Sequence, residues 1–199
     1  GKLDGKVDLV WINGENFRTG KKAGLFFGPF AERLPNARFL NAQEPAVRSD
    51  FGVPTDGYES PWNRAQFVFI YDTTRVPVPP SSLDALTRFI EANPGRFTYP
   101  APPDFTGSAF LRHVLYEIAG DPATLQGPLD EARWKELSPR LFALLARWRP
   151  NLWQGGRTFP ESSSRLHQLF AQGEVWVSMS YGPQTASSRI REGQLPEAP

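Results

Sequence analysis

The chain has 199 residues, of which 40% are apolar and 22% are charged, values that are ordinary for a globular protein. Its formal net charge is +1 and its acidic and basic residues are interspersed, so it lacks the basic stripe expected of a nucleic-acid-binding protein. It contains no cysteine, which excludes disulfides, Cys-containing metal sites and thiol nucleophiles.

The N-terminal third begins with a predicted strand and then becomes irregular. Residues 7–12, VDLVWI, are almost continuously apolar and rich in β-branched side chains, which is typical of a buried strand in a parallel sheet. Residues 14–34 predict a loop followed by a helix, and the glycines in this segment weaken the helix prediction. Residues 35–65 are punctuated by proline and glycine, and a long irregular stretch of this kind is usually functional or mobile.

The rest of the chain predicts strands that alternate with helices. Apolar runs at residues 65–71 and 174–181 predict strands, and residues 97–99 are a weaker strand candidate. Helical periodicity follows in four segments: from Ser82, from Thr106, over residues 130–148 with an interruption at Pro139, and from Ser162. This alternation predicts an α/β fold with a mostly parallel sheet flanked by helices.

The sequence shows no sign of a catalytic centre. Neither a phosphate-binding loop nor a nucleophile elbow is present. The two histidines, His113 and His167, lie in predicted helices among apolar neighbours, and neither has a second ligand at metal-binding spacing. We therefore predict no catalytic residue, no metal and no cofactor, and we assign both histidines to packing or to a helix surface.

Candidate binding residues occur at a helix start and at a strand end. Thr106, Gly107 and Ser108 open a helix, where backbone N–H groups and the positive end of the helix dipole can meet a ligand. A plain helix cap explains the same residues at least as well. Ser180 and Tyr181 end a strand, and ligands of open α/β sheets bind beyond the carboxyl ends of the strands.

Aromatic and acidic side chains of the irregular region suit a positively charged ligand. Aromatic faces and carboxylates together hold cations well, although Trp and Tyr near loops often only pack. The residues concerned are Tyr58 and Trp62, with Tyr181 as a third ring, and Glu15, Asp56 and Glu59 as the acids.

The order of these segments resembles that of the type 2 periplasmic solute-binding proteins of ABC importers. Residues 7–17 resemble the strand and ligand-side loop of the first lobe, and residues 57–62 followed by 65–72 resemble the strand that crosses to the second lobe. Residues 104–110 are similar to the helix-start ligand loop of the second lobe, and residues 176–181 to a strand whose terminal Ser and Tyr face the cleft. The similarity covers nearly all of the chain and is greatest to the thiamine-type or uncharacterised subgroup.

The resemblance implies an α/β fold of the type 2 periplasmic-binding-protein kind and a two-lobed parent of which this chain is an internal segment. Residues 1–65 would be part of the first lobe with the approach to the hinge, and residues 66–199 the second lobe. The implied ligand site lies between the lobes: Glu15, Asn16, Tyr58 and Trp62 on the first, and Thr106, Gly107, Ser108, Ser180 and Tyr181 on the second.

The function that the resemblance implies is extracytoplasmic capture of a small solute for a membrane permease, and the subgroup implies a thiamine-like cation as that solute. The location would be periplasmic or extracellular, with the export signal outside this chain. Two alternatives remain open, namely an enzyme such as a transferase on the same scaffold and an interaction module without a small ligand. We also expect self-association through residues 1–65, because a buried-type strand without neighbours exposes an edge.

Overall fold

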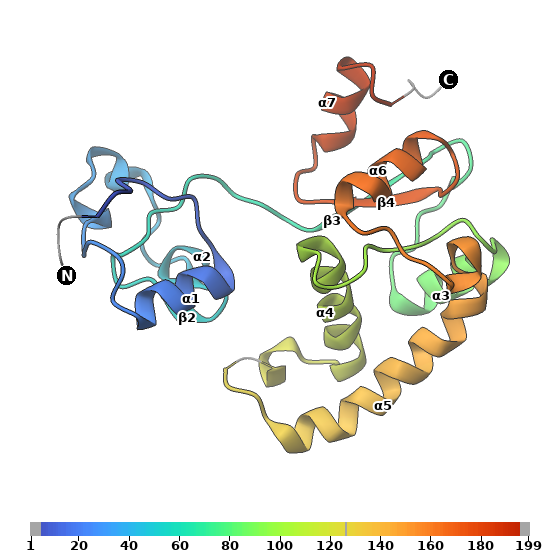
Figure 1. Ribbon diagram of the computed structural model, residues 1–199, viewed down its shortest axis with the longest axis horizontal. Coiled ribbons are helices and arrows are strands. Elements are labelled where there is room, and N and C mark those ends of the chain that lie inside the picture. The colour runs from blue at the N-terminus through green and yellow to red at the C-terminus, as the bar shows by residue number, and fades with distance from the viewer. Residues whose placement is uncertain (1–4, 126, 196–199) are drawn as a thin grey trace. The chain divides into compact units, whose positions relative to one another are not determined.

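The computed structural model describes residues 5–125 and 127–195, which divide into two compact units between Arg64 and Ala65. Figure 1 labels the α-helices of both units and all strands except β1. None of the helices among the described residues combines the length and apolar character that crossing a bilayer demands.

Unit 1 consists of short elements. They are helix α1 (Gly14–Lys22), 3₁₀ turns at Ala31–Arg33 and Pro35–Phe39, helix α2 (Pro45–Arg48), and strands β1 (Ser49–Asp50) and β2 (Val53–Pro54). The two strands form an antiparallel hairpin. In α1, Glu15 lies in the first turn and Lys21 and Lys22 in the last, which is the charge order that the helix dipole favours.

The core of unit 1 is thin. The Phe17 side chain is fully buried and stacks on Phe26 with 5.7 Å between ring centroids. Gly20 makes this packing possible, because a Cβ atom there would lie 2.3 Å from the Phe26 ring. Within residues 5–64, Phe17 is the one fully buried apolar side chain, so most apolar side chains of this unit remain in contact with solvent.

The strand predicted at residues 7–12 is not formed. Val7, Leu9, Val10 and Trp11 are 53–88% exposed, and the residues around them have no strand assignment. The prediction was wrong because a buried strand needs neighbours on its edges and faces, and none of the described residues pairs with this segment. An apolar run therefore lies extended on the surface of unit 1.

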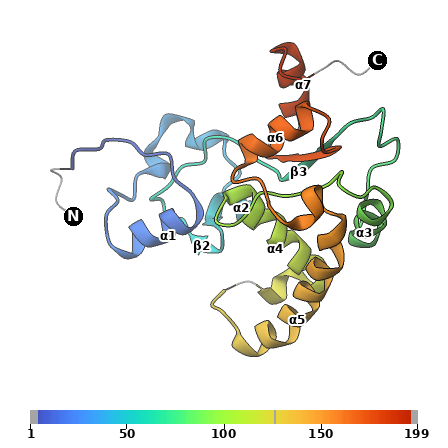
Figure 2. The ribbon, with the colours of Figure 1, turned by 45° about the vertical axis from the view of Figure 1, so that its right-hand side comes forward.

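Unit 2 contains most of the regular structure. Its elements are β3 (Val68–Tyr71), α3 (Leu83–Ala92), α4 (Phe105–Ala119), α5 (Glu131–Trp148), α6 (Ser163–Ala171), β4 (Val177–Ser180) and α7 (Thr185–Arg191), with 3₁₀ turns at Pro122–Leu125, Arg149–Asn151 and Trp153–Gly156. Helix α6 lies against β4, and α4 packs beside α5 (Figures 1 and 2).

The predicted helix starts are confirmed. The hydroxyl of Ser82 accepts a hydrogen bond from the Ala85 amide (3.1 Å), and that of Ser162 accepts one from the Arg165 amide (3.2 Å). The predicted interruption at Pro139 is wrong, because α5 continues through it. Pro139 lies on the exposed side of α5, where water can satisfy the carbonyl group that loses its N–H partner.

The sheet differs from the prediction. β3 and β4 form a two-stranded antiparallel ribbon with Val68 opposite Ser180 and Tyr71 opposite Val177. No strand pair within the described residues is parallel, so the predicted mostly parallel sheet is wrong and unit 2 is mostly helical. The apolar run at residues 174–181 indicated burial correctly, since Val177 and Met179 are buried, but burial does not fix strand direction.

Trp148 lies at the centre of the core of unit 2. Its side chain is fully buried, stacks on Phe110, and donates a hydrogen bond from Nε1 to the Thr87 hydroxyl at 3.0 Å. Residues 97–99, the weaker strand candidate, are buried in the same core without forming a strand. The core thus joins α3, α4, α5, α6 and β4 into one support for the edge where α4 begins and β4 ends.

Candidate functional site

The start of α4 and the end of β4 meet in unit 2. Thr106 is buried, and its hydroxyl lies beside the phenol of Tyr181. Burial raises the pKa of the Tyr181 phenol, and the neighbouring Thr106 hydroxyl opposes part of that rise. The Tyr181 hydroxyl oxygen is itself buried and has no partner in full hydrogen-bond geometry among the described residues. Thr106 and Tyr181 therefore lie at the same edge of unit 2, where α4 begins and β4 ends, and the Tyr181 hydroxyl is a buried polar group at that edge.

Aromatic rings surround Tyr181. Its ring lies 5.5 Å from that of Phe105 and 5.8 Å from that of Phe67, which contacts His113 edge-on at 4.8 Å. Burial lowers the pKa of His113, with a further lowering by Arg112 and an opposing effect of Glu117. The rings form a polarizable, largely uncharged wall that could pack against the flat part of a solute.

The α4 start does not present open amides, contrary to our expectation for Thr106, Gly107 and Ser108. The carboxylate of Asp104 accepts hydrogen bonds from the amides of Thr106 (2.9 Å) and Gly107 (3.0 Å), and the Ser108 amide bonds the Asp104 carbonyl (2.9 Å). Gly107 allows close packing rather than ligand approach, because a Cβ atom there would lie 1.9 Å from the Pro100 carbonyl oxygen. The helix-cap interpretation is the correct one for these backbone groups.

The two serines of β4 are engaged inside unit 2. The Ser180 hydroxyl donates to the Thr185 hydroxyl at 2.7 Å and so holds the start of α7. The Ser178 hydroxyl lies 2.9 Å from Nδ1 of His167. Burial, with the positive charge of Arg189, lowers the pKa of His167 to about 4, so this ring is neutral near pH 7 and serves packing.

The predicted site residues of unit 1 have different environments. Glu15 and Asn16 are exposed on the first turn of α1, and the Tyr58 ring packs against Gly28, where a Cβ atom would lie 2.7 Å away. Trp62 is 79% exposed and contacts Trp11 edge-on at 5.5 Å. A depression of about 150 Å³ lies beside Trp62, lined also by Glu44, Ala46, Val47, Pro61, Asn63 and Arg64.

Unit 1 also holds a carboxylate pair. The Gly14 amide, at the start of α1, donates a hydrogen bond to Asp50. Burial raises the pKa of Asp50, and this hydrogen bond opposes the rise. Burial and the charge of Asp50 together raise the pKa of Glu59 to about 7, and one Glu59 oxygen is buried without a hydrogen-bond partner among the described residues. The sequence analysis named Glu59 only as one of the acids that suit a cation and missed Asp50, because nothing local marks either residue as buried.

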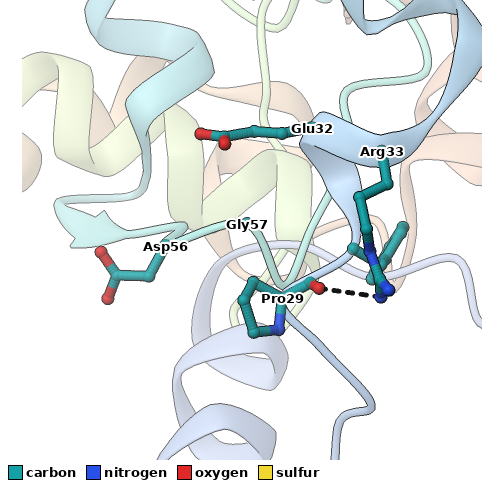
Figure 3. Close-up of a pocket in the computed structure, with 6 residues that line it drawn as sticks. Pro29, Glu32, Arg33, Asp56 and Gly57 are labelled. Carbon is teal, nitrogen blue, oxygen red and sulfur yellow. Dashed lines mark hydrogen bonds between the residues drawn. The ribbon is translucent and has the colours of Figure 1, made fainter.

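A second hollow of unit 1, of about 390 Å³, appears in Figure 3. Two of its charged residues have partners: Arg33 donates to the Pro29 carbonyl at 3.0 Å, as Figure 3 shows, and Asp56 pairs with Lys21 at 2.6 Å. Phe30, Glu32 and Gly57 complete the lining. None of the residues of the predicted ligand site lines this hollow.

The described residues contain no cluster of acidic or histidine side chains arranged to hold a metal ion. The sequence matches the family of bacterial extracellular solute-binding proteins over residues 1–194, and the chain belongs to this family. It is a family of binding proteins rather than of enzymes, which removes the enzyme alternative.

Protein YnjB of Escherichia coli strain K12 is similar to the chain, with 45% identity over 195 residues. The match covers 98% of this chain and 50% of YnjB, so the chain spans about half the length of this relative. The resemblance to solute-binding proteins is thus confirmed for the family, whereas the thiamine-type subgroup is a finer assignment that belongs to the proposal below.

Proposed function

We propose that this chain belongs to the part of an ABC importer that captures a small cationic solute outside the cytoplasm and delivers it to a membrane permease. Its membership of the extracellular solute-binding family supports the general role, the extracytoplasmic location and the permease as partner. A solute of the thiamine kind, with a flat ring and a positive charge, is the ligand class that we propose.

The proposed contact surface in unit 2 is the edge where Thr106 meets Tyr181. The observation that carries the proposal is the buried hydroxyl of Tyr181 within an aromatic wall. It lies beside the Thr106 hydroxyl without a hydrogen bond of full geometry, so a polar group of a solute could complete its hydrogen bonding. The amides of Gly107 and Ser108 bond Asp104, and the Ser180 hydroxyl bonds Thr185 in α7. These residues therefore shape the edge and do not offer these donors to a solute.

The proposed contribution of unit 1 is negative charge and further aromatic surface. Glu15 and Asn16 offer exposed polar groups, and Tyr58 and Trp62 offer rings. In a two-lobed binding protein such groups would meet the solute from the other side when the lobes close by a hinge motion.

Native mass spectrometry of the chain purified from bacterial cells tests capture directly, and calorimetry with thiamine as the probe tests the ligand class. Tyr181→Ala removes one ring, and a ring contact of this kind contributes about 0.5–1.5 kcal/mol beyond area burial. We therefore expect affinity to fall about tenfold, at ~1.4 kcal/mol per decade. Phe142→Ala, which removes an exposed ring of α5, is the control and should leave affinity unchanged.

An unchanged affinity in Tyr181→Ala, with the fold intact by circular dichroism, would reject the Thr106–Tyr181 edge as the site. Absence of a retained solute, together with no thermal shift on adding thiamine or other organic cations, would favour the interaction module without a small ligand.

A further inference from the structure

One carboxylate, that of Asp104, bonds the N-terminal ends of two helices. Its Oδ1 atom accepts hydrogen bonds from the amides of Thr106 and Gly107 in α4, at 2.9 and 3.0 Å. Its Oδ2 atom accepts a hydrogen bond from the amide of Ser163, the first residue of α6, at 3.2 Å. Asp104 therefore ties the two helix starts together, within electrostatic reach of Tyr181.

This arrangement changes the electrostatics of the edge. The N-terminus of a helix carries partial positive charge and free N–H groups, and it commonly binds an anionic group of a ligand. Here an internal carboxylate already occupies that place at both helices. Burial is the main cause of the raised pKa of the Tyr181 phenol; the positive charge of Arg112 lowers this pKa, and the negative charge of Asp104 raises it and so also reaches the site.

We propose that Asp104 sets the charge selectivity of this edge: it fills the position that an anionic group of a solute would take, so the edge accepts cationic and neutral solutes and rejects anionic ones. This inference rests on the proposed location of the solute site at Thr106 and Tyr181. It adds a specificity-determining residue that does not itself need to touch the solute.

Asp130 provides a matched comparison within the same unit. It caps α5 with the same geometry, accepting hydrogen bonds from the amides of Ala132 (2.9 Å) and Arg133 (3.0 Å). Asp130 is exposed and these hydrogen bonds all lie within α5, whereas Asp104 is half-buried and bonds two helices. An effect of Asp104 that Asp130 lacks therefore cannot be attributed to helix capping as such.

Anion binding to the chain tests the inference without knowledge of the natural solute. The variants are Asp104→Ser and Asp130→Ser, because Ser is also a strong N-cap and should preserve the helices. Sulfate is the anionic probe and tetramethylammonium the cationic one, each followed by NMR shifts of the backbone amides. We expect sulfate to bind at the amides of Gly107 and Ser163 about fivefold more tightly in Asp104→Ser than in the parent chain. Tetramethylammonium should bind more weakly there, and Asp130→Ser should change neither probe at this edge.

The ionisation of Tyr181, followed by NMR of ¹³C-labelled tyrosine, gives a second readout. Its pKa should fall in Asp104→Ser, because a nearby negative charge is removed, and should stay unchanged in Asp130→Ser. Equal sulfate binding in the parent chain and Asp104→Ser, or an unchanged Tyr181 pKa in Asp104→Ser, would overturn the inference. These readouts use no natural solute, so they can succeed even where the Tyr181→Ala experiment rejects the proposed site. Failure of the Asp104 inference is therefore distinguishable from failure of the proposed solute site.

Discussion

Replacing Glu59 by Gln should remove a pH dependence from the stability of unit 1. In the folded chain, burial and the neighbouring charge of Asp50 raise the pKa of Glu59 from its ordinary value of 4.5 to about 7. Between these two pH values the folded form binds more protons than the unfolded form. The free energy of unfolding therefore decreases as the pH rises from about 4.5 to about 7, and it levels off above that range.

The size of the effect follows from the shift. At about 1.36 kcal/mol per pKa unit, the rise from 4.5 to about 7 corresponds to roughly 3 kcal/mol. Glu59 is only partly buried, so solvent screening reduces this figure to about 1–2 kcal/mol. Gln has nearly the same shape and no charge, so Glu59→Gln should unfold with little dependence on pH across this window and should be the more stable form above pH 7.

Hydrogen exchange at the amides of α1 reports the opening of unit 1 separately from that of unit 2, once intrinsic exchange rates are corrected for pH. Measurements at pH 5, 6, 7 and 8 should show the decrease in the parent chain and in the control Glu32→Gln, whose side chain is exposed. A parent chain whose protection stays constant over this range would refute the reasoning, because Glu59 would then be ionised at no cost to the fold.

Two further predictions concern association and the second unit. The chain should self-associate through residues 7–12 and Trp62, because Val7, Leu9, Val10, Trp11 and Trp62 are each more than half exposed and together offer an apolar surface for a second copy to cover. Light scattering should detect the association, Trp11→Ser should weaken it, and a monomer at every concentration would count against it. The stability of unit 2 should decrease as the pH falls from 6.5 to about 4. In this range His167 stays neutral in the folded chain, whereas in the unfolded chain it takes up a proton, which favours unfolding. Urea unfolding at pH 7 and pH 4.5 measures this, and His167→Gln should lessen the difference; equal pH dependence in both proteins would argue against the assignment.

Helix positions were predictable because their signals are local. Ser82 and Ser162 each stand before an apolar periodicity, and each hydroxyl bonds the amide three residues later. A helix cap was offered for the start of α4, but not the residue that supplies it: the capping side chain is Asp104, which also bonds Ser163 in a distant part of the sequence.

Strand pairing and buried charge were not predictable for a related reason. The composition of residues 7–12 favours a strand, but a strand forms only where another one accepts its hydrogen bonds, and that partner is non-local. The same limit applies to the direction of β3 and β4, which pair antiparallel. At the candidate site, the nearness of Thr106 to Tyr181 was predicted from the geometry of helix and strand ends, whereas the raised pKa of Glu59 depends on tertiary burial.

The start of unit 2 is bonded to the end of β4, beyond which the unit continues through α7 (Thr185–Arg191). The amide of Gln66, two residues into this unit, donates a hydrogen bond to the carbonyl of Tyr181 at 3.0 Å, immediately after β4 ends. The intervening chain is thus a loop with joined ends, of the kind that tolerates excision, transplantation into another protein or circular permutation. A permuted chain that starts at an exposed turn between these two residues should keep this hydrogen bond.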